Sequence, residues 1–246
     1  MRNITNYAEK YSLHSFEEYK VMYRRKKLIE IIGAYHPKSI LEIGCGYDPL
    51  FQYVDDAQFT VVEPASDFYQ NAVNLSRGGG RTVLIEGFFE DVAPRLSDNY
   101  DMVICASLLH EVEFPDKFLN AIVGVCSVNT IVNITVPNAN SMHRFLGKEI
   151  GMLTDVHDMS QNNIDFQQNN VFDKNSLNKI VIESGMEIVE EGGFFIKPFS
   201  HKQMYEMMVS GILNAEVLDG LYALGENEMV EYASEIYVNC RVKTVE

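Results

Sequence analysis

The sequence predicts an α/β fold built on a mostly parallel sheet. Short β-branched segments alternate with helix-like segments along most of the chain, which is the pattern of a sheet with right-handed crossovers. The segment 100–106 is apolar throughout, as expected of a strand that is covered on both faces. With 246 residues, 46% of them hydrophobic, the chain can bury a sizeable core. No repeat or linker marks a second unit, so we expect a single domain over 1–246.

The chain up to residue 136 is predicted to form a helix followed by five strands, with two more helices between them. Apolar residues at three- and four-residue steps from Phe16 to Ala34 predict an amphipathic helix, within an N-terminal helical segment that spans 1–36. Gly33 and Pro37 end it. Strands are expected at 39–43, 59–63, 82–86, 100–106 and 130–136, and helices at 66–75 and 115–125.

Two segments after the fifth strand interrupt this alternation. Residues 138–175 are rich in Asn, Gln, Asp, Met and His and show little periodicity, so we expect an insertion that serves as a substrate lid. A helix at 176–184 and a strand from Met186 follow, and a strand at 235–243 ends the chain. Between these last two strands, 200–232 predicts a helical insertion. Its Met-rich stretch either packs in the core, caps a site or forms a homodimer face (Met204, Met207, Met208 and Leu213).

Charge and composition exclude some partners. The chain has 20 Lys plus Arg against 35 Asp plus Glu, a net charge of −15, which disfavours nucleic acids and anionic membrane surfaces. No apolar run reaches the roughly 18–20 residues that cross a bilayer, and the N-terminus lacks the apolar centre of a signal peptide. We therefore expect a cytoplasmic protein. Its four cysteines are far apart, as suits reduced thiols.

A glycine-rich turn follows the first predicted strand. Gly44 and Gly46 allow a ligand to approach the backbone, and Glu63 ends the second strand 17 residues after Gly46, where a carboxylate can accept hydrogen bonds from a ribose diol. A dinucleotide site needs a third glycine, but Pro49 stands in its place, and Glu42 precedes the first glycine by two residues. The pattern favours a different nucleoside.

These motifs resemble those of the class I S-adenosylmethionine-dependent methyltransferases, enzymes of the EC 2.1.1 class. The resemblance covers most of the chain: acid-x-Gly-x-Gly at 42–46, Glu63-Pro64, Phe88-Phe89-Glu90-Asp91, and the segment 100–112. It implies a Rossmann-like, seven-stranded, mostly parallel sheet with helices on both faces and an antiparallel last strand.

The resemblance also implies the cofactor, S-adenosyl-L-methionine, with S-adenosyl-L-homocysteine as product. The glycines would pass under its methionine and ribose parts, Glu42 would orient the amino-acid end, and Phe89 with Glu90 would border the adenine. The cofactor set that it implies is Glu42, Gly44, Cys45, Gly46, Asp48, Glu63, Pro64, Phe89, Glu90 and Ser107. Asp48 replaces a common third glycine, and Phe88 stands where many members carry an aspartate. The adenine amino group would then be bound by Glu90, by Asp91 or by the backbone.

Histidines mark the acceptor side. Methyl transfer is an in-line displacement, and a hydroxyl acceptor must also lose a proton to a base. His110 and His143 follow the fourth and fifth strands, where ligands of α/β sheets bind, so both are catalytic candidates. Arg144 suits an anionic acceptor or an ordinary ion pair, and His157 is a weaker candidate contact. The spacing of Asp155, His157 and Asp158 matches no strong ligand pattern, so we expect no metal.

The acceptor class depends on a narrower resemblance. Segments 137–147 and 193–204 are similar to those of methyltransferases from sugar-modifying and surface-polysaccharide gene sets, which implies O-methylation of a sugar, a sugar nucleotide or a capsule precursor. In that subgroup a Gly-His-Arg-like stretch precedes the aromatic at Phe172, and this chain has Phe166-Gln-Gln-Asn-Asn-Val instead. Three alternatives stay open: a quinone-type or other aromatic acceptor, a non-catalytic cofactor-binding subunit, and an NAD-binding protein.

Overall fold

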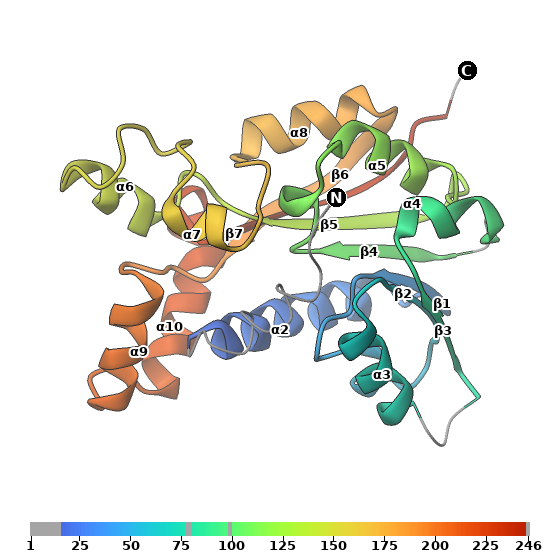
Figure 1. Ribbon diagram of the computed structural model, residues 1–246, viewed down its shortest axis with the longest axis horizontal. Coiled ribbons are helices and arrows are strands. Elements are labelled where there is room, and N and C mark those ends of the chain that lie inside the picture. Colours follow the sequence, from blue (N-terminus) through green and yellow to red (C-terminus); the bar gives the residue numbers. More distant parts are fainter. Residues whose placement is uncertain (1–15, 77–79, 98–99, 245–246) are drawn as a thin grey trace.

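The computed structural model describes residues 16–76, 80–97 and 100–244. A seven-stranded sheet forms its centre, in the order β3-β2-β1-β4-β5-β7-β6 (Figure 1). The strands are β1 (Ser39–Ile43), β2 (Gln58–Glu63), β3 (Thr82–Glu86), β4 (Met102–Ala106), β5 (Ile131–Pro137), β6 (Met186–Phe194) and β7 (Glu235–Val242). The predicted fold class and the positions of the strands are confirmed.

Strand direction places the ligand-binding edge. Strands β1 to β5 pair in parallel, and β7 is antiparallel to both β5 and β6. Strand β6 therefore runs in the same direction as β5. The carboxyl ends of β1 to β6 and the start of β7 thus meet at one edge of the sheet, where ligands of such sheets bind.

Helices cover both faces of the sheet (Figure 1). One face carries α4 (Phe89–Val92), α5 (Pro115–Val123) and α8 (Lys174–Glu183), and the other carries α2 (Glu17–Tyr35), α3 (Ser66–Leu75) and α10 (Ala215–Glu226). Each face buries its own apolar cluster, around Phe118 and Ile122 on the first and around Tyr23 and Ile31 on the second. Short 3₁₀ turns complete the connections: η1 (Leu50–Gln52), η2 (Ala93–Arg95), η3 (Leu109–Glu111) and η4 (Val230–Tyr232).

Two helical regions differ from their predicted form. The segment 138–175 is not irregular, since it contains α6 (Met142–Glu149) and α7 (Gln161–Asp165). The predicted helical insertion at 200–232 consists of two separate helices, α9 (His201–Val209) and α10, and Gly211 takes a positive φ of 75° between them. Short helices of this kind depend on tertiary contacts that periodicity does not reveal. The part of the predicted N-terminal segment before Phe16 lies outside the described residues.

The Met-rich stretch packs inside the protein. Met204 and Leu213 are buried, and Met207 and Met208 pack against the same cluster as α2. Core packing therefore accounts for the buried part of this stretch. Within the described residues, no helix has both the length and the apolar character to cross a membrane.

Candidate functional site

A cleft of about 2590 Å³ opens at the carboxyl edge of the sheet. This is larger than a typical pocket for one small molecule, so it has room for two ligands side by side. It brings together all ten residues of the expected cofactor set, and also His110, His143 and Arg144. His157 is not among its lining residues. Two parts of this cleft differ in chemistry: the glycine-turn half (residues 42–48, 63–65, 88–91 and 107) and the basic half (Glu17, Lys20, Arg24, His143, Arg144, Lys197, His201 and Ser234).

The glycine turn brings bare backbone to the cleft. Gly44 and Gly46 have φ angles of 75° and 56°, in the left-handed region that favours glycine. A Cβ atom on Gly44 would lie 3.3 Å from Cδ2 of Leu108, which follows β4. A side chain at Gly44 would therefore be strained by its backbone and crowded by Leu108.

Glu63 is fixed by the turn that it faces. Its Oε2 accepts a hydrogen bond from the backbone N–H of Gly46 at 3.1 Å, and its Oε1 accepts one from Ala65 at 2.9 Å. Burial raises the pKa of this carboxyl group, which is only 4% exposed. These contacts hold the carboxylate against the glycine turn, and a carboxylate at the end of this strand is the group that suits the two hydroxyls of a ribose.

Glu42 adds a second buried acid. Both of its carboxylate oxygens lie 3.2 Å from the backbone nitrogen of Leu50. Burial, reinforced by the negative charges of Glu63 and Asp48, raises the pKa of Glu42 to about 8. A cationic ligand group beside it would favour the ionised form, so this half of the cleft is suited to positive charge.

Two further members of the set have structural partners. Asp48 forms an ion pair with Arg25 of α2 and accepts a hydrogen bond from the Tyr53 hydroxyl at 2.6 Å, so it fastens α2 to the turn. Burial raises the pKa of the Cys45 thiol, which keeps it protonated and unreactive at neutral pH.

The far wall of this half is formed after β2, β3 and β4. Phe89 is buried with its ring edge-on to Phe118, 5.5 Å between centroids, while Glu90 is exposed and Pro64 lines the cleft. Ser107 directly follows β4 and has a φ of 54°, an uncommon conformation for a residue with a side chain. Its N–H donates to the Thr135 carbonyl at 2.7 Å. Such strain at a cleft is typical of a functional site.

His143 lies on α6 at the edge of the basic half. Its Nδ1 is buried and has no hydrogen-bond partner among the described residues. Burial, followed by the nearby charge of Lys197, lowers its pKa well below the usual range, so the imidazole is neutral at pH 7. In the tautomer that carries its hydrogen on Nε2, this Nδ1 can accept a proton.

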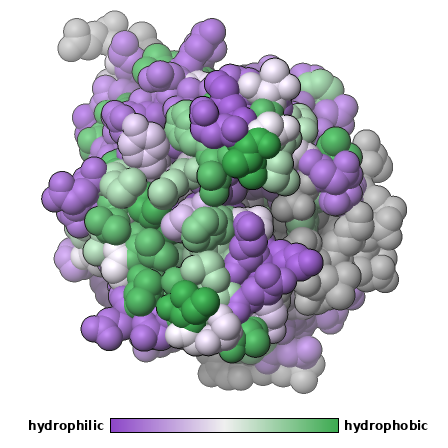
Figure 2. Space-filling model, turned by 90° about the vertical axis from the view of Figure 1, so that its left-hand side faces the viewer, coloured by the Kyte–Doolittle hydropathy of each residue, from purple (hydrophilic) through white to green (hydrophobic). Residues whose placement is uncertain are grey.

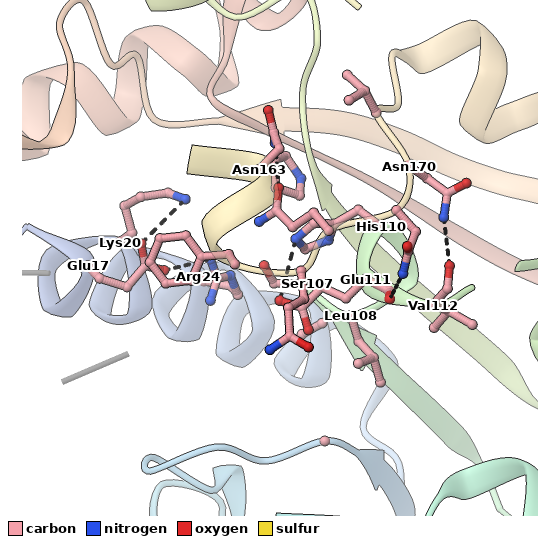
Figure 3. Close-up of a pocket in the computed structure, with 18 of the residues that line it drawn as sticks. Glu17, Lys20, Arg24, Ser107, Leu108, His110, Glu111, Val112, Asn163 and Asn170 are labelled. Atoms are coloured by element: carbon pink, nitrogen blue, oxygen red, sulfur yellow. Dashed lines mark hydrogen bonds and ion pairs between the residues drawn. The ribbon is translucent and has the colours of Figure 1, made fainter. Parts of the chain in front are cut away.

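His110 is held beneath the loop that follows α7. Its backbone carbonyl accepts the N–H groups of Asn169 and Asn170, both at 3.0 Å. The side-chain amides of the same two asparagines donate to the carbonyls of Glu111 and Val112, at 2.8 and 2.7 Å (Figure 3). The insertion after β5 thus lies directly over the histidine at the end of β4.

Arg144 and His157 are engaged within that insertion. The Arg144 guanidinium donates to the carbonyls of Val156 and Asp158 and to Oδ1 of Asn163. These hydrogen bonds fix the loop between α6 and α7. His157 lies 3.0 Å from Oδ1 of Asp155 and 3.2 Å from Oδ2 of Asp173, outside the cleft lining. Neither side chain is placed as a free contact for an acceptor. In the described part of the chain, no group of three or more His, Cys, Asp or Glu side chains is placed to hold a metal ion.

The charged cluster of the basic half was not predicted from the sequence. Glu17, Lys20 and Arg24 project from α2 toward the cavity, across from the segment that contains Ser107 and His110 (Figure 3). Their spacing of three and four residues, which places charges on one helix face, was the available signal. Arg24 pairs with Glu235 through two hydrogen bonds of 2.7 and 2.6 Å, and Lys20 lies 3.2 Å from the same carboxylate. Lys197 and His201 complete the cluster: the lysine Nζ lies 3.0 Å from His201 Nδ1, and His201 Nε2 lies 3.1 Å from Glu17.

Comparison with known proteins identifies the family. The sequence profile described as "Methyltransferase domain" matches residues 15–191. The plantazolicin methyltransferase BamL, solved with a triazolic desmethylPZN analog and SAH, has a TM-score of 0.63 at 15% identity, covering 96% of this chain and 90% of that one. Magnesium protoporphyrin IX methyltransferase (ChlM) from Synechocystis PCC 6803 has a TM-score of 0.57 at 10% identity, with coverages of 89% and 82%. A SAM-dependent methyltransferase from Archaeoglobus fulgidus has a TM-score of 0.54 at 12% identity, with coverages of 88% and 94%.

At such identities the structural matches establish the fold alone. No curated protein sequence matches the chain significantly. The profile, however, spans well over half of the sequence and includes the glycine turn and both catalytic candidates. The chain belongs to the methyltransferase domain family.

Proposed function

We propose that the chain transfers the methyl group of S-adenosylmethionine to an oxygen of a small polar acceptor, such as a sugar, a sugar nucleotide or a surface-polysaccharide precursor. The observation that carries this proposal is the neutral imidazole of His143, whose Nδ1 has no hydrogen-bond partner in the described part of the chain and which lines the same cleft as the glycine turn. A methyl donor and a proton acceptor are what a hydroxyl substrate requires.

In this proposal the glycine-turn half holds the cofactor. Gly44 and Gly46 lie beneath its methionine and ribose parts, Glu63 accepts the ribose hydroxyls, and Glu42 faces the ammonium group. Phe89 and Glu90 border the adenine. The two buried acids of this half support the assignment, because the cofactor carries positive charge at its sulfonium and ammonium groups.

The reaction is an in-line displacement. An oxygen lone pair of the acceptor forms a bond to the methyl carbon, the carbon–sulfur bond breaks, and its electron pair stays on sulfur as S-adenosylhomocysteine. The hydroxyl proton passes to His143 Nδ1, with His110 as the other candidate at the end of β4. The segment 138–175 acts as the lid, since its asparagines already contact the backbone around His110. Positioning the acceptor supplies much of the acceleration.

An aromatic acceptor is the second candidate, and one observation favours it. The end of the molecule that carries α6, α9 and α10 gathers hydrophobic side chains among charged ones (Figure 2). Several apolar side chains there line the cleft and are exposed: Leu146, Ile150, Met152 and Tyr205. They offer an apolar wall on which a flat ring can lie.

A turnover assay separates the two candidates. The purified protein is incubated with S-adenosylmethionine and either sugar phosphates and sugar nucleotides or phenols and hydroxyquinones, and methylated products are detected by mass spectrometry. We expect product with the first group, lost by a factor of roughly 100 or more in His143→Gln if His143 is the base. Product from the second group alone would replace the polar acceptor with the aromatic one. Absence of any product from a protein that binds the cofactor would favour the non-catalytic subunit.

A further inference from the structure

Lys197 is a buried lysine that lines the cleft and forms no ion pair with a carboxylate of the described residues. It lies three residues after β6, at the carboxyl edge of the sheet, and is 3% exposed. Among the described residues, no carboxylate lies within ion-pair distance of its Nζ, whose hydrogen-bond partner is the imidazole of His201. Burial lowers the pKa of Lys197 well below its usual range.

The two acids in and beside the basic half, Glu17 and Glu235, already form ion pairs with other side chains. Glu235 holds Arg24 and Lys20, and Glu17 pairs with Arg24 and with His201. Two carboxylates thus face two permanent cations, and a protonated Lys197 would add a third positive charge. A buried charge of this kind is costly unless an anion joins it.

Two polar groups near the Lys197 segment have no hydrogen-bond partner among residues 16–76, 80–97 and 100–244. The Ser234 hydroxyl lines the cleft in a residue that is 3% exposed, and it has no hydrogen-bond partner within the described part of the chain. Ser234 is adjacent to the lysine segment, because its backbone N–H donates to the Phe195 carbonyl at 2.8 Å. His143 contributes its partnerless Nδ1 from α6, close enough for the lysine charge to lower its pKa. A hydroxyl and a cation that converge on one cavity form a place for anionic oxygens.

The backbone at this point is held in an uncommon conformation. Phe195 is bulky and buried yet has a φ of 62°, and α10 approaches it so closely that a Cβ on Gly225 would lie 2.3 Å from the Phe195 nitrogen. Strain of this kind is maintained where the surrounding packing enforces it, and it is concentrated at functional sites.

We propose that Lys197 and Ser234 form a subsite for an anionic group of the acceptor, a phosphate or a carboxylate, and that this subsite orients the acceptor toward His143. The proposal rests on the proposed function and narrows its substrate to an anionic molecule. It also assigns the anion contact that the sequence predicted for Arg144 to Lys197. The Lys197 ammonium group contacts His201, whereas the Arg144 guanidinium donates to residues of the 138–175 insertion. Lys197 is a positioning residue here, since the transferred methyl group does not pass through it.

Simple anions test this subsite directly. The protein is saturated with S-adenosylhomocysteine and titrated at low ionic strength with inorganic phosphate, with malonate and with uncharged glycerol. We expect saturable binding of phosphate or malonate and none of glycerol, and the anion that binds identifies a phosphate or a carboxylate as the recognised group. Lys197→Met should weaken this binding roughly tenfold or more, the usual loss for a hydrogen bond to a charged group.

A matched lysine supplies the control. Lys117, on α5, also lines the cleft, but its ammonium group lies over the ring of Phe114, which precedes that helix. Lys117→Met should therefore leave anion binding unchanged. Equal binding in the two variants, or no anion binding by a protein that binds S-adenosylhomocysteine, would overturn the subsite and leave the proposed function intact. Failure to bind S-adenosylhomocysteine would instead remove the proposed function. If Lys197→Met does not fold, Ser234→Ala decides: weaker anion binding supports the subsite, and unchanged binding overturns it.

Discussion

The glycine-turn half and the basic half of the cleft bury titratable groups of opposite type. In the first, Glu42 and Glu63 form no ion pair within the described residues, and burial raises the pKa of both. In the second, Lys197 forms no ion pair with a described carboxylate, and burial lowers its pKa. A ligand group of the opposite charge would favour the ionised form in each half. This contrast suits a cationic methyl donor in the first half and, under our proposal, an anionic acceptor in the second.

The largest effect is expected from the acid that faces the ribose. Glu63→Ala removes the carboxylate that accepts the N–H groups of Gly46 and Ala65, and with it both contacts to a ribose diol. We expect S-adenosylhomocysteine affinity to fall about 100-fold, by calorimetry. Glu86 pairs in register with Glu63 on the neighbouring β3 but is exposed, so Glu86→Gln is the control. Unchanged affinity in Glu63→Ala would show that the ribose lies elsewhere.

The packing behind the basic half gives the next effect. In Gly225→Ala the new methyl group would meet the Phe195 backbone, so α10 or the Lys197 segment must shift, and we expect a loss of about 1–3 kcal/mol in unfolding free energy. Gly220 lies on the same helix with nothing within 4 Å of its Cβ position. Gly220→Ala should stabilise the protein by up to about 1 kcal/mol. Equal responses in denaturant melts would mean that this close contact is absent.

A smaller, local effect tests the role of Arg144. Arg144→Gln leaves the carbonyls of Val156 and Asp158 without their donor, at a cost of about 1–3 kcal/mol in local stability. Hydrogen exchange should therefore quicken over 154–164, with anion binding unchanged. Lys148 on the same helix reaches only Asp155 on the surface, so Lys148→Gln should change neither. If Arg144→Gln instead abolishes anion binding and leaves hydrogen exchange unchanged, Arg144 is the residue that contacts the acceptor.

Cofactor binding should also depend on pH. The pKa of Glu42 is about 8 in the free protein, so the group is largely protonated at pH 6, and a cationic ligand group favours its ionised form. Binding then releases a proton, and affinity should rise as pH increases from 6 to 8, by at most about tenfold per pH unit. Glu42→Gln should flatten this slope. A slope that survives the substitution must come from another group.

The two halves also differ in how far the sequence predicts them. The glycine turn, Glu42 and Glu63 lie within about two dozen residues, at the carboxyl ends of two adjacent strands. Their spacing in the sequence is therefore enough to predict that they lie together. Lys20, Lys197 and Ser234 come from α2, the end of β6 and the start of β7, and only the strand order of the folded sheet brings them to one edge. Arg144 shows the same limit, because its carbonyl partners depend on a loop conformation that no periodicity encodes. The strands, in contrast, were predictable because their burial produces continuous apolar runs.

The most direct test of the account is a calorimetric titration of the purified protein with S-adenosylhomocysteine, with NADH as the control. The account predicts saturable one-to-one binding of S-adenosylhomocysteine and no heat from NADH, because the turn lacks the third glycine of a dinucleotide site and presents two buried acids. Binding of NADH, or silence with S-adenosylhomocysteine in a folded sample, would contradict it.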